Sequence, residues 1–384
     1  MAGSTTEGSA PPTAAPRSAL AQRLLDIEPS GRSSWLDPAA CQAVIARGLP
    51  DTRGEPWKYT NVNRWYDVAF TRQEPAALDI DAPDDILVVD FDDPRTRPLA
   101  AAHGGKAFDL AKQPLAAVNG LLLGGGVAIV VPGDWRGEAP IRIADGGPSY
   151  QHILLIVESG ASITLIEEAS GFTHRIVETV VETGGRLRHL RRQRPAPTRE
   201  CSLVAVHLDQ DARYELAQSC RGAELRRNDV VVTLAGTGAR VTVNGAWRLV
   251  GREHLDNQVA INHVAPQGFS RQTFRGVVAD RARAVLNGRI HIAAGAKATD
   301  AALNTKNLLA TDNAEVYAKP ELEIFESDVQ CSHGATVGTL DEEAVFFLRT
   351  RGLSDEAARA LLVRGFLREA VADDEGAARL ELVA

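Results

Sequence analysis

The 384-residue sequence lacks long hydrophobic runs, a secretory leader and a cysteine framework. No stretch of about 18 consecutive apolar residues occurs, so we expect no membrane-spanning helix. The N-terminus does not have the basic and then apolar order of a signal peptide. Four cysteines in a chain of this length do not form a disulfide framework. These absences favour a cytoplasmic protein without a membrane partner.

Signatures of nucleotide binding and of serine hydrolysis are also missing. There is no G-x-x-x-x-G-K-S/T phosphate loop and no G-x-S-x-G elbow. The formal net charge of −8 argues against duplex DNA as the main partner, which usually requires a basic face. We therefore expect no nucleic-acid partner and no ATP site in this chain.

The N-terminal part of the chain combines a polar tail with helical signals. Residues 1–16 are rich in Ala, Pro, Ser and Thr and predict a disordered tail. Residues 17–99 predict a helical region, in which Asp37 before Pro38 is typical of an N-cap followed by proline at the first helical position. Residues 61–70 are equally compatible with a helix and an extended segment.

From about residue 100, strand-like alternation replaces helical spacing. Related fragments, each a small or polar start followed by alternating apolar residues, begin 24, 27 and 27 residues apart, at Gly160, Gly184, Asp211 and Gly238, and a later relative begins at Asn313. An interval in this range predicts stacked repeats, and short strands with turns favour a β-helix over residues 100–338. The alternative is an antiparallel sandwich with regular hairpins.

Residues 339–384 predict a C-terminal helical region. Thr339 and Glu342 match a capping box, and Ser354 is a candidate cap for a second helix. Apolar residues of that second helix occupy more than one face: Ala358, Leu361, Leu362, Gly365 and Phe366 share one, and Val363 and Leu367 lie off it. Either a partner covers the second face or both faces are buried within the chain.

Among the cysteines, Cys331 has a histidine two residues away. Thiolate and imidazole are suitable ligands for iron, and on a strand residues i and i+2 point to the same side. The bland alternative is a structural cysteine beside a surface histidine. Cys331 and His333 are too few ligands for a cluster, so a site here needs ligands from a second chain. Cys41, Cys201 and Cys220 are interpreted as small buried apolar residues.

The stretch 319–338, KPELEIFESDVQCSHGATVG, resembles the C-terminal signature of the SufB/SufD family, the β-helical scaffold proteins of the Suf iron–sulfur assembly system. Within that family, the form Cys-Ser-His-Gly-Ala-Thr resembles the SufD branch, because the SufB branch usually has an acidic residue at the position of Gly334. Further stretches extend the resemblance: 55–60, 274–278, 286–289, 304–309 and 340–352.

The resemblance implies a right-handed parallel β-helix flanked by N-terminal and C-terminal helical regions. It implies a non-catalytic scaffold that pairs with a SufB-like protein along the β-helix and holds a SufC-like ATPase through its C-terminal helices. The residues expected at that ATPase interface are Phe346, Phe347, Leu361, Leu362, Phe366 and Leu367. The family's interface histidine falls on His333 and its neighbouring cysteine on Cys331, where a nascent iron–sulfur cluster is shared with the partner.

A reduced flavin is associated with the family's complex, and no residue of this chain is assigned to it. Three other functions stay open. The chain could be a SufB-like paralogue, or an interaction protein that acts as a homodimer. It could also be a β-helix enzyme acting on carbohydrates, which requires clustered charged residues along a groove that the sequence does not display.

Overall fold

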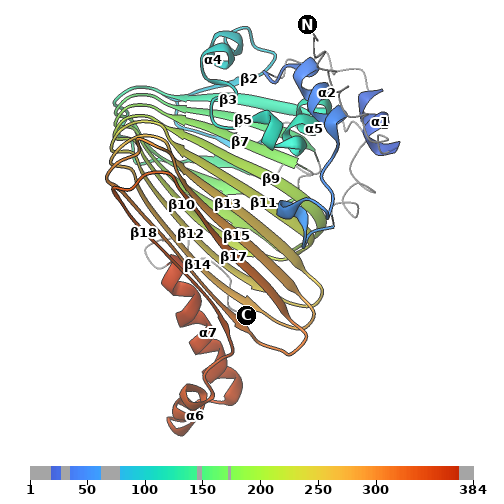
Figure 1. Cartoon of the computed structure of the whole chain (residues 1–384), viewed down its shortest axis with the longest axis vertical. Coiled ribbons are helices and arrows are strands. Elements are labelled where there is room, and N and C mark those ends of the chain that lie inside the picture. The colour runs from blue at the N-terminus through green and yellow to red at the C-terminus, as the bar shows by residue number, and fades with distance from the viewer. Residues whose placement is uncertain (1–18, 27–34, 62–77, 145–148, 172–173, 372–384) are drawn as a thin grey trace, which may run out of the picture.

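The computed structural model describes residues 19–26, 35–61, 78–144, 149–171 and 174–371 (Figure 1). The predicted tail at 1–16, nearly all of the ambiguous segment 61–70, and the last thirteen residues lie outside this part. The described chain is mainly β, with helices before and after a long solenoid of strands. This is the β-helix with flanking helical regions that the sequence predicted.

Short helices form the N-terminal part: α1 (Ala19–Leu25), α2 (Pro38–Arg47), the 3-10 turns η1 (Glu55–Trp57) and η2 (Leu110–Lys112), α4 (Thr96–His103) and α5 (Pro114–Leu122). Helix α2 begins as predicted, because the Asp37 carboxylate accepts hydrogen bonds from the backbone N–H groups of Ala39 and Ala40 at 3.1 and 3.2 Å. It ends at Gly48, whose φ of 127° favours glycine.

The strands form two nine-stranded sheets, called sheet A and sheet B. Sheet A contains β1 (Ile80–Asp81), β4 (Ile141–Ile143), β6 (Ser162–Glu168), β8 (Arg186–Gln193), β10 (Arg213–Arg221), β12 (Arg240–Leu249), β14 (Phe269–Val278), β16 (Thr299–Leu309) and β18 (Val329–Gly338). Sheet B contains β2 (Leu87–Asp90), β3 (Gly125–Val131), β5 (Tyr150–Val157), β7 (His174–Val181), β9 (Ala196–Leu208), β11 (Ala223–Leu234), β13 (His254–His263), β15 (Arg283–Ile292) and β17 (Glu315–Ile324).

From β3 onwards successive strands alternate between the sheets, so each strand pairs with the strand two places along the chain; at the N-terminal end β2 pairs with β3 and β1 with β4. These pairs are parallel, apart from β1 with β4 and β2 with β3 at the N-terminal end. A parallel pair needs a long crossover and cannot be closed by a hairpin. The antiparallel sandwich is therefore wrong.

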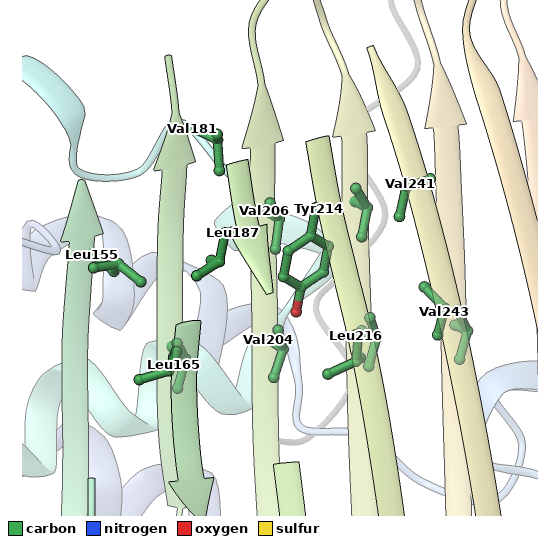
Figure 2. Packing of buried hydrophobic residues seen from close by; sticks show 14 of the residues in the cluster. Leu155, Leu165, Val181, Leu187, Val204, Val206, Tyr214, Leu216, Val241 and Val243 are labelled. Carbon is green, nitrogen blue, oxygen red and sulfur yellow. The ribbon is translucent and has the colours of Figure 1, made fainter. Parts of the chain in front are cut away.

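The repeats aligned in the sequence are also aligned in space. Ile163, Leu187, Tyr214 and Val241 occupy equivalent positions of four fragments and are paired in register on neighbouring strands of sheet A. All four belong to the apolar core of the solenoid, and Figure 2 shows Leu187, Tyr214 and Val241 beside side chains of sheet B such as Val204 and Val206. Stacking of equivalent residues buries each rung on the next, which is why the interval is nearly constant.

Two details of the pattern differ from the prediction. The fragment that begins at Asn313 lies in sheet B, since Val316 pairs with Ala284 of β15, so it is not a further member of the sheet A series. Helix α4 also extends past residue 100 and α5 lies wholly beyond it, so the regular parallel strands begin only at Gly125. The nearly continuous apolar run of α5 and β3 explains this, because periodicity does not separate a buried helix from a buried strand.

Helix α5 packs on the outer face of sheet B, against residues that include Tyr150, Ile176 and Leu203. Its Asn119 places Nδ2 at 2.8 Å from Nδ1 of His174 on β7, and both side chains are buried. Burial, with a further contribution from His152, lowers the pKa of His174 to about 3. The contact between the helix and the sheet therefore uses a neutral imidazole.

Lowering the pH from 7 to 5 should destabilise the fold. Burial also lowers the pKa of His263 to about 4. A histidine whose pKa is lowered by folding contributes fully above its unfolded pKa of about 6.5, and this contribution is lost as the pH falls below that value. His174 and His263 should each lower the free energy of unfolding by about 2 kcal/mol at pH 5. Urea denaturation at pH 7 and pH 5 measures this loss, and the loss should be smaller in His174→Gln. Equal denaturation midpoints at the two pH values would contradict the prediction.

The C-terminal helices are α6 (Glu342–Thr350) and α7 (Asp355–Val371). The capping box at Thr339 is wrong: the cap of α6 is Asp341, whose carboxylate accepts from the N–H groups of Glu343 and Ala344. An aspartate one residue before the helix reaches these groups directly. Ser354 caps α7 as predicted, accepting from the N–H of Ala357 at 3.2 Å.

Candidate functional site

The solenoid ends in two edge strands. In the described part of the chain, β18 pairs with β16 alone and β17 pairs with β15 alone, so one edge of each strand has no neighbouring strand. An unpaired edge presents backbone N–H and C=O groups that can pair with another chain. Figure 1 shows this end of the solenoid close to helices α6 and α7. The C-terminal end of the solenoid is therefore a candidate interface.

Cys331 and His333 lie on the edge strand β18, as the strand prediction requires. They pair in register with Ala301 and Leu303 of β16, which are buried residues of a small apolar core. Parallel strands in register direct paired side chains to the same side. Cys331 and His333 therefore share the side of the strand that faces the interior, at the last rung of the solenoid.

The two side chains differ in exposure. Cys331 is half-buried against the core that includes Ile290 and Ile292, and His333 is exposed. Burial, followed by the charge of Asp300, raises the pKa of the Cys331 thiol. The thiol is therefore protonated at neutral pH in this state, and binding a metal ion requires release of that proton.

This pair does not form a complete metal site by itself. Among the residues that the structure describes, no group of three or more His, Cys, Asp or Glu side chains is arranged to hold a metal ion. A tetrahedral thiolate site requires four ligands per iron, and bridging sulfides supply only some of them. The geometry is that of a partial site on an open edge.

The other three cysteines are buried, as predicted from the sequence. Burial raises the pKa of Cys41 to about 12 and that of Cys220 to about 11, and raises the pKa of Cys201 well above its usual range. Thiols that stay protonated and covered are poor nucleophiles and poor ligands. Cys331 is thus the accessible thiol among the four.

The interior of the solenoid contains charged residues that the sequence did not indicate. Glu167 is fully buried and lies 3.0 Å from Nη1 of Arg175, 2.9 Å from Nε of Arg191 and 3.0 Å from Nε2 of His189. Burial alone would raise the pKa of Glu167, but these three partners lower it below its usual range. The charged cluster is enclosed, so it does not form the open groove that a carbohydrate-active enzyme requires.

The candidate ATPase-interface residues divide into two groups. Phe346 is 67% exposed, Phe347 and Leu361 are also exposed, and Leu362 and Phe366 are half-buried. Leu367 is only 1% exposed and packs with Ala246 and Val277 on the outer face of sheet A. Leu367 is therefore unavailable to a partner, and its assignment to the interface is wrong. One face of α7 thus packs on sheet A of the same chain, and the opposite face is exposed to solvent.

The early motif Glu55–Thr60 lies on the outer face of sheet B, where it contacts residues that are distant from it in the sequence. Glu55 pairs with Lys319 of β17 at 2.6 Å, and Trp57 lies under the guanidinium of Arg227 at 3.5 Å. Tyr59 stacks on Tyr317 at 4.1 Å between ring centroids. The motif thus connects the N-terminal region to strands β11 and β17 of sheet B, a role that sequence spacing did not reveal.

The family description "SUF system FeS cluster assembly, SufBD core domain" matches residues 141–366, which is more than half of the chain. The chain belongs to the SufBD family. The matched residues cover the solenoid from β4 onwards and most of the C-terminal helices, including Cys331 and His333. Family membership and the parallel solenoid agree with the resemblance found in the sequence.

Several SufBD relatives have moderate identity. The iron–sulfur cluster assembly protein SufD of Escherichia coli is 33% identical over 237 residues, covering 59% of this chain and 55% of that protein. A SufBD family protein of Mycobacterium bovis is 26% identical over 351 residues and 86% of both chains. The SufB protein of Bacillus subtilis is 25% identical over 281 residues, covering 69% of this chain and 60% of that protein. The chain spans about half the length of the first curated relatives it matches.

No helix in the described part of this SufBD protein combines the length and the apolar character needed to cross a bilayer.

Proposed function

We propose that this chain is a SufD-like scaffold subunit that assembles iron–sulfur clusters together with a SufB-like protein and a SufC-like ATPase. The observation that carries the proposal is the position of Cys331 and His333 on β18, an edge strand at the open end of the solenoid. The SufB-like protein pairs at this end and supplies the missing ligands. The nascent cluster is therefore the cargo of a site shared by two chains.

Two observations favour the SufD branch over a SufB-like paralogue. Gly334 follows the histidine where the SufB branch usually has an acidic residue. The identity to SufD of Escherichia coli, 33%, is also higher than the identity to SufB of Bacillus subtilis, 25%. A subunit of this branch contributes part of the ligand set and leaves the rest to its partner.

The division of labour follows from what the chain contains. In this proposal the ATPase partner binds and hydrolyses ATP, and this chain, whose sequence has no phosphate loop, acts as a cytoplasmic, non-catalytic scaffold. The exposed side chains of α6 and α7 are the docking surface for that ATPase. A reduced flavin in the complex has no assigned residue here.

Co-purification tests this function. The full chain should capture both a SufB-like protein and a SufC-like ATPase when the three are expressed together. Capture of neither partner by a folded chain would reject the scaffold function. Size-exclusion chromatography of the chain alone measures whether it forms a homodimer, which is the alternative to pairing with a SufB-like protein.

Phe346→Asp should weaken binding of the ATPase at least tenfold, because an exposed aromatic at the centre of an interface is a typical hot spot. Isothermal titration of the isolated chain with the ATPase measures the affinity. Phe325→Asp is the matched control, since Phe325 is 65% exposed but lies between β17 and β18. Equal affinities for the Phe346 variant and the unmodified chain would exclude α6 from the docking surface.

A further inference from the structure

A side-chain bridge connects helix α7 with sheet A. Arg275, on the outer face of β14, donates from Nε to Oε2 of Glu369 on α7 at 2.8 Å. Its guanidinium also lies 5.9 Å from the ring centroid of Phe366, and Lys306 of β16 approaches Glu369 at 3.8 Å. The apolar contacts of Leu367 with the sheet hold the helix at this place. Glu369 thus provides the anion for a guanidinium that belongs to the sheet.

The same guanidinium reaches toward the edge strand. Nη1 of Arg275 donates to Oδ1 of Asn304 on β16 and to the carbonyl of Phe274, each at 2.8 Å. Asn304 pairs in register with Gly334 of β18, and a Cβ built on Gly334 would lie 3.5 Å from Nδ2 of Asn304. The chain of contacts from Glu369 through Arg275 and Asn304 therefore ends next to Gly334, the residue after His333 on β18.

The burial of these groups makes the bridge sensitive to the position of α7. The Arg275 side chain is 7% exposed and Glu369 is 49% exposed. A nearly buried guanidinium that loses its carboxylate must find another partner or move toward water. Either response changes the hydrogen bond to Asn304, since one planar group serves both neighbours.

We propose that Arg275 is a positioning residue that couples helix α7 to the edge strand β18. The position of α7 on sheet A then determines how rigidly β18, the strand of Cys331 and His333, is held. Arg275 and Asn304 lie in the stretches 274–278 and 304–309, both of which are part of the family resemblance. The coupling gives these two stretches a structural role. Its use as a response to ATPase docking rests on the proposed function. The bridge itself is a property of this chain alone.

Hydrogen exchange of the isolated full chain tests the coupling. Glu369→Gln removes the anion and keeps the shape of the side chain, and it should increase exchange of the β18 amides roughly threefold, the effect of a partly exposed ion pair. Arg275→Lys should have a similar effect, because an ammonium group cannot serve Glu369 and Asn304 in the same fork geometry. Alkylation of Cys331 by iodoacetamide, measured in parallel, should accelerate by a similar factor.

Glu342→Gln is the matched control. Glu342 pairs with Arg359 at 2.8 Å, and this ion pair joins α6 to α7 without involving the described strands of the sheet, so its removal should leave β18 unchanged. Unchanged exchange and alkylation in both Glu369→Gln and Arg275→Lys would overturn the coupling, as would equal acceleration in Glu342→Gln. Neither measurement needs a partner, so failure of the coupling is distinct from failure to capture the SufB-like protein and the ATPase.

Discussion

Replacing His333 with alanine should lower cluster assembly by the complete complex at least tenfold while leaving the fold of the chain intact. Loss of a second-sphere group already costs a metal site about 10- to 100-fold, and a direct ligand should cost no less. His333 is exposed on the edge strand, and in the described part of the chain no hydrogen bond or ion pair holds it. Its removal should therefore change the free energy of unfolding by less than about 0.5 kcal/mol.

The assay for this variant is the rate of cluster formation, followed by the charge-transfer absorption of the cluster in the purified complex. Ser332→Ala is the matched control, because Ser332 is the exposed neighbour on β18 whose side chain points to the opposite face. Normal cluster formation by a correctly assembled His333→Ala complex would remove this residue from the site. A defect of the same size in Ser332→Ala would indicate damage to the strand and not loss of a ligand.

Glu167→Gln should destabilise the chain by about 3–5 kcal/mol, the cost of removing one partner from a buried charge cluster. Glu167 is the anion for both Arg175 and Arg191, and all three side chains are fully buried. A neutral amide removes the negative charge that both guanidinium groups contact in the interior, and a buried charge whose ion pair is weakened is costly. Urea denaturation followed by circular dichroism measures the change at neutral pH.

The adjacent residue on the same strand provides the comparison for this variant. Glu168 faces the surface and pairs at 3.4 Å with Arg192 and Arg194, so Glu168→Gln should cost about 1 kcal/mol or less. We therefore predict a larger loss of stability for Glu167→Gln than for Glu168→Gln. Equal losses for Glu167 and Glu168 would mean that burial does not decide the energetics of this cluster.

The strands of sheet A could be predicted because they repeat a local rule. A small or polar start and alternating apolar residues recur at Gly160, Gly184, Asp211 and Gly238, and each fragment packs on the next. The helix caps at Asp37 and Ser354 are local in the same sense, since a side chain reaches the N–H groups two or three residues away. Helix α5 was not predicted because its buried sequence has no distinguishing period.

The candidate site was predictable only in part. The spacing of Cys331 and His333 and the resemblance of their stretch to the SufB/SufD family identified the residues. The sequence could not indicate that β18 is an edge strand, because that depends on which strands precede and follow it in space. It also placed Leu367 at the partner interface, since periodicity shows that a helix has two apolar faces but not which of them sheet A covers.

The sequence by itself determined the family, the parallel solenoid and the identity of the two potential ligands, because these follow from local patterns and a long contiguous resemblance. The tertiary structure decided the rest. It enclosed Glu167 with Arg175 and Arg191, placed Cys331 and His333 at an open edge, and connected Arg275 to both helix α7 and Asn304. Such contacts join residues about 8 to 94 positions apart in the chain, and only the stacking of successive rungs brings them together.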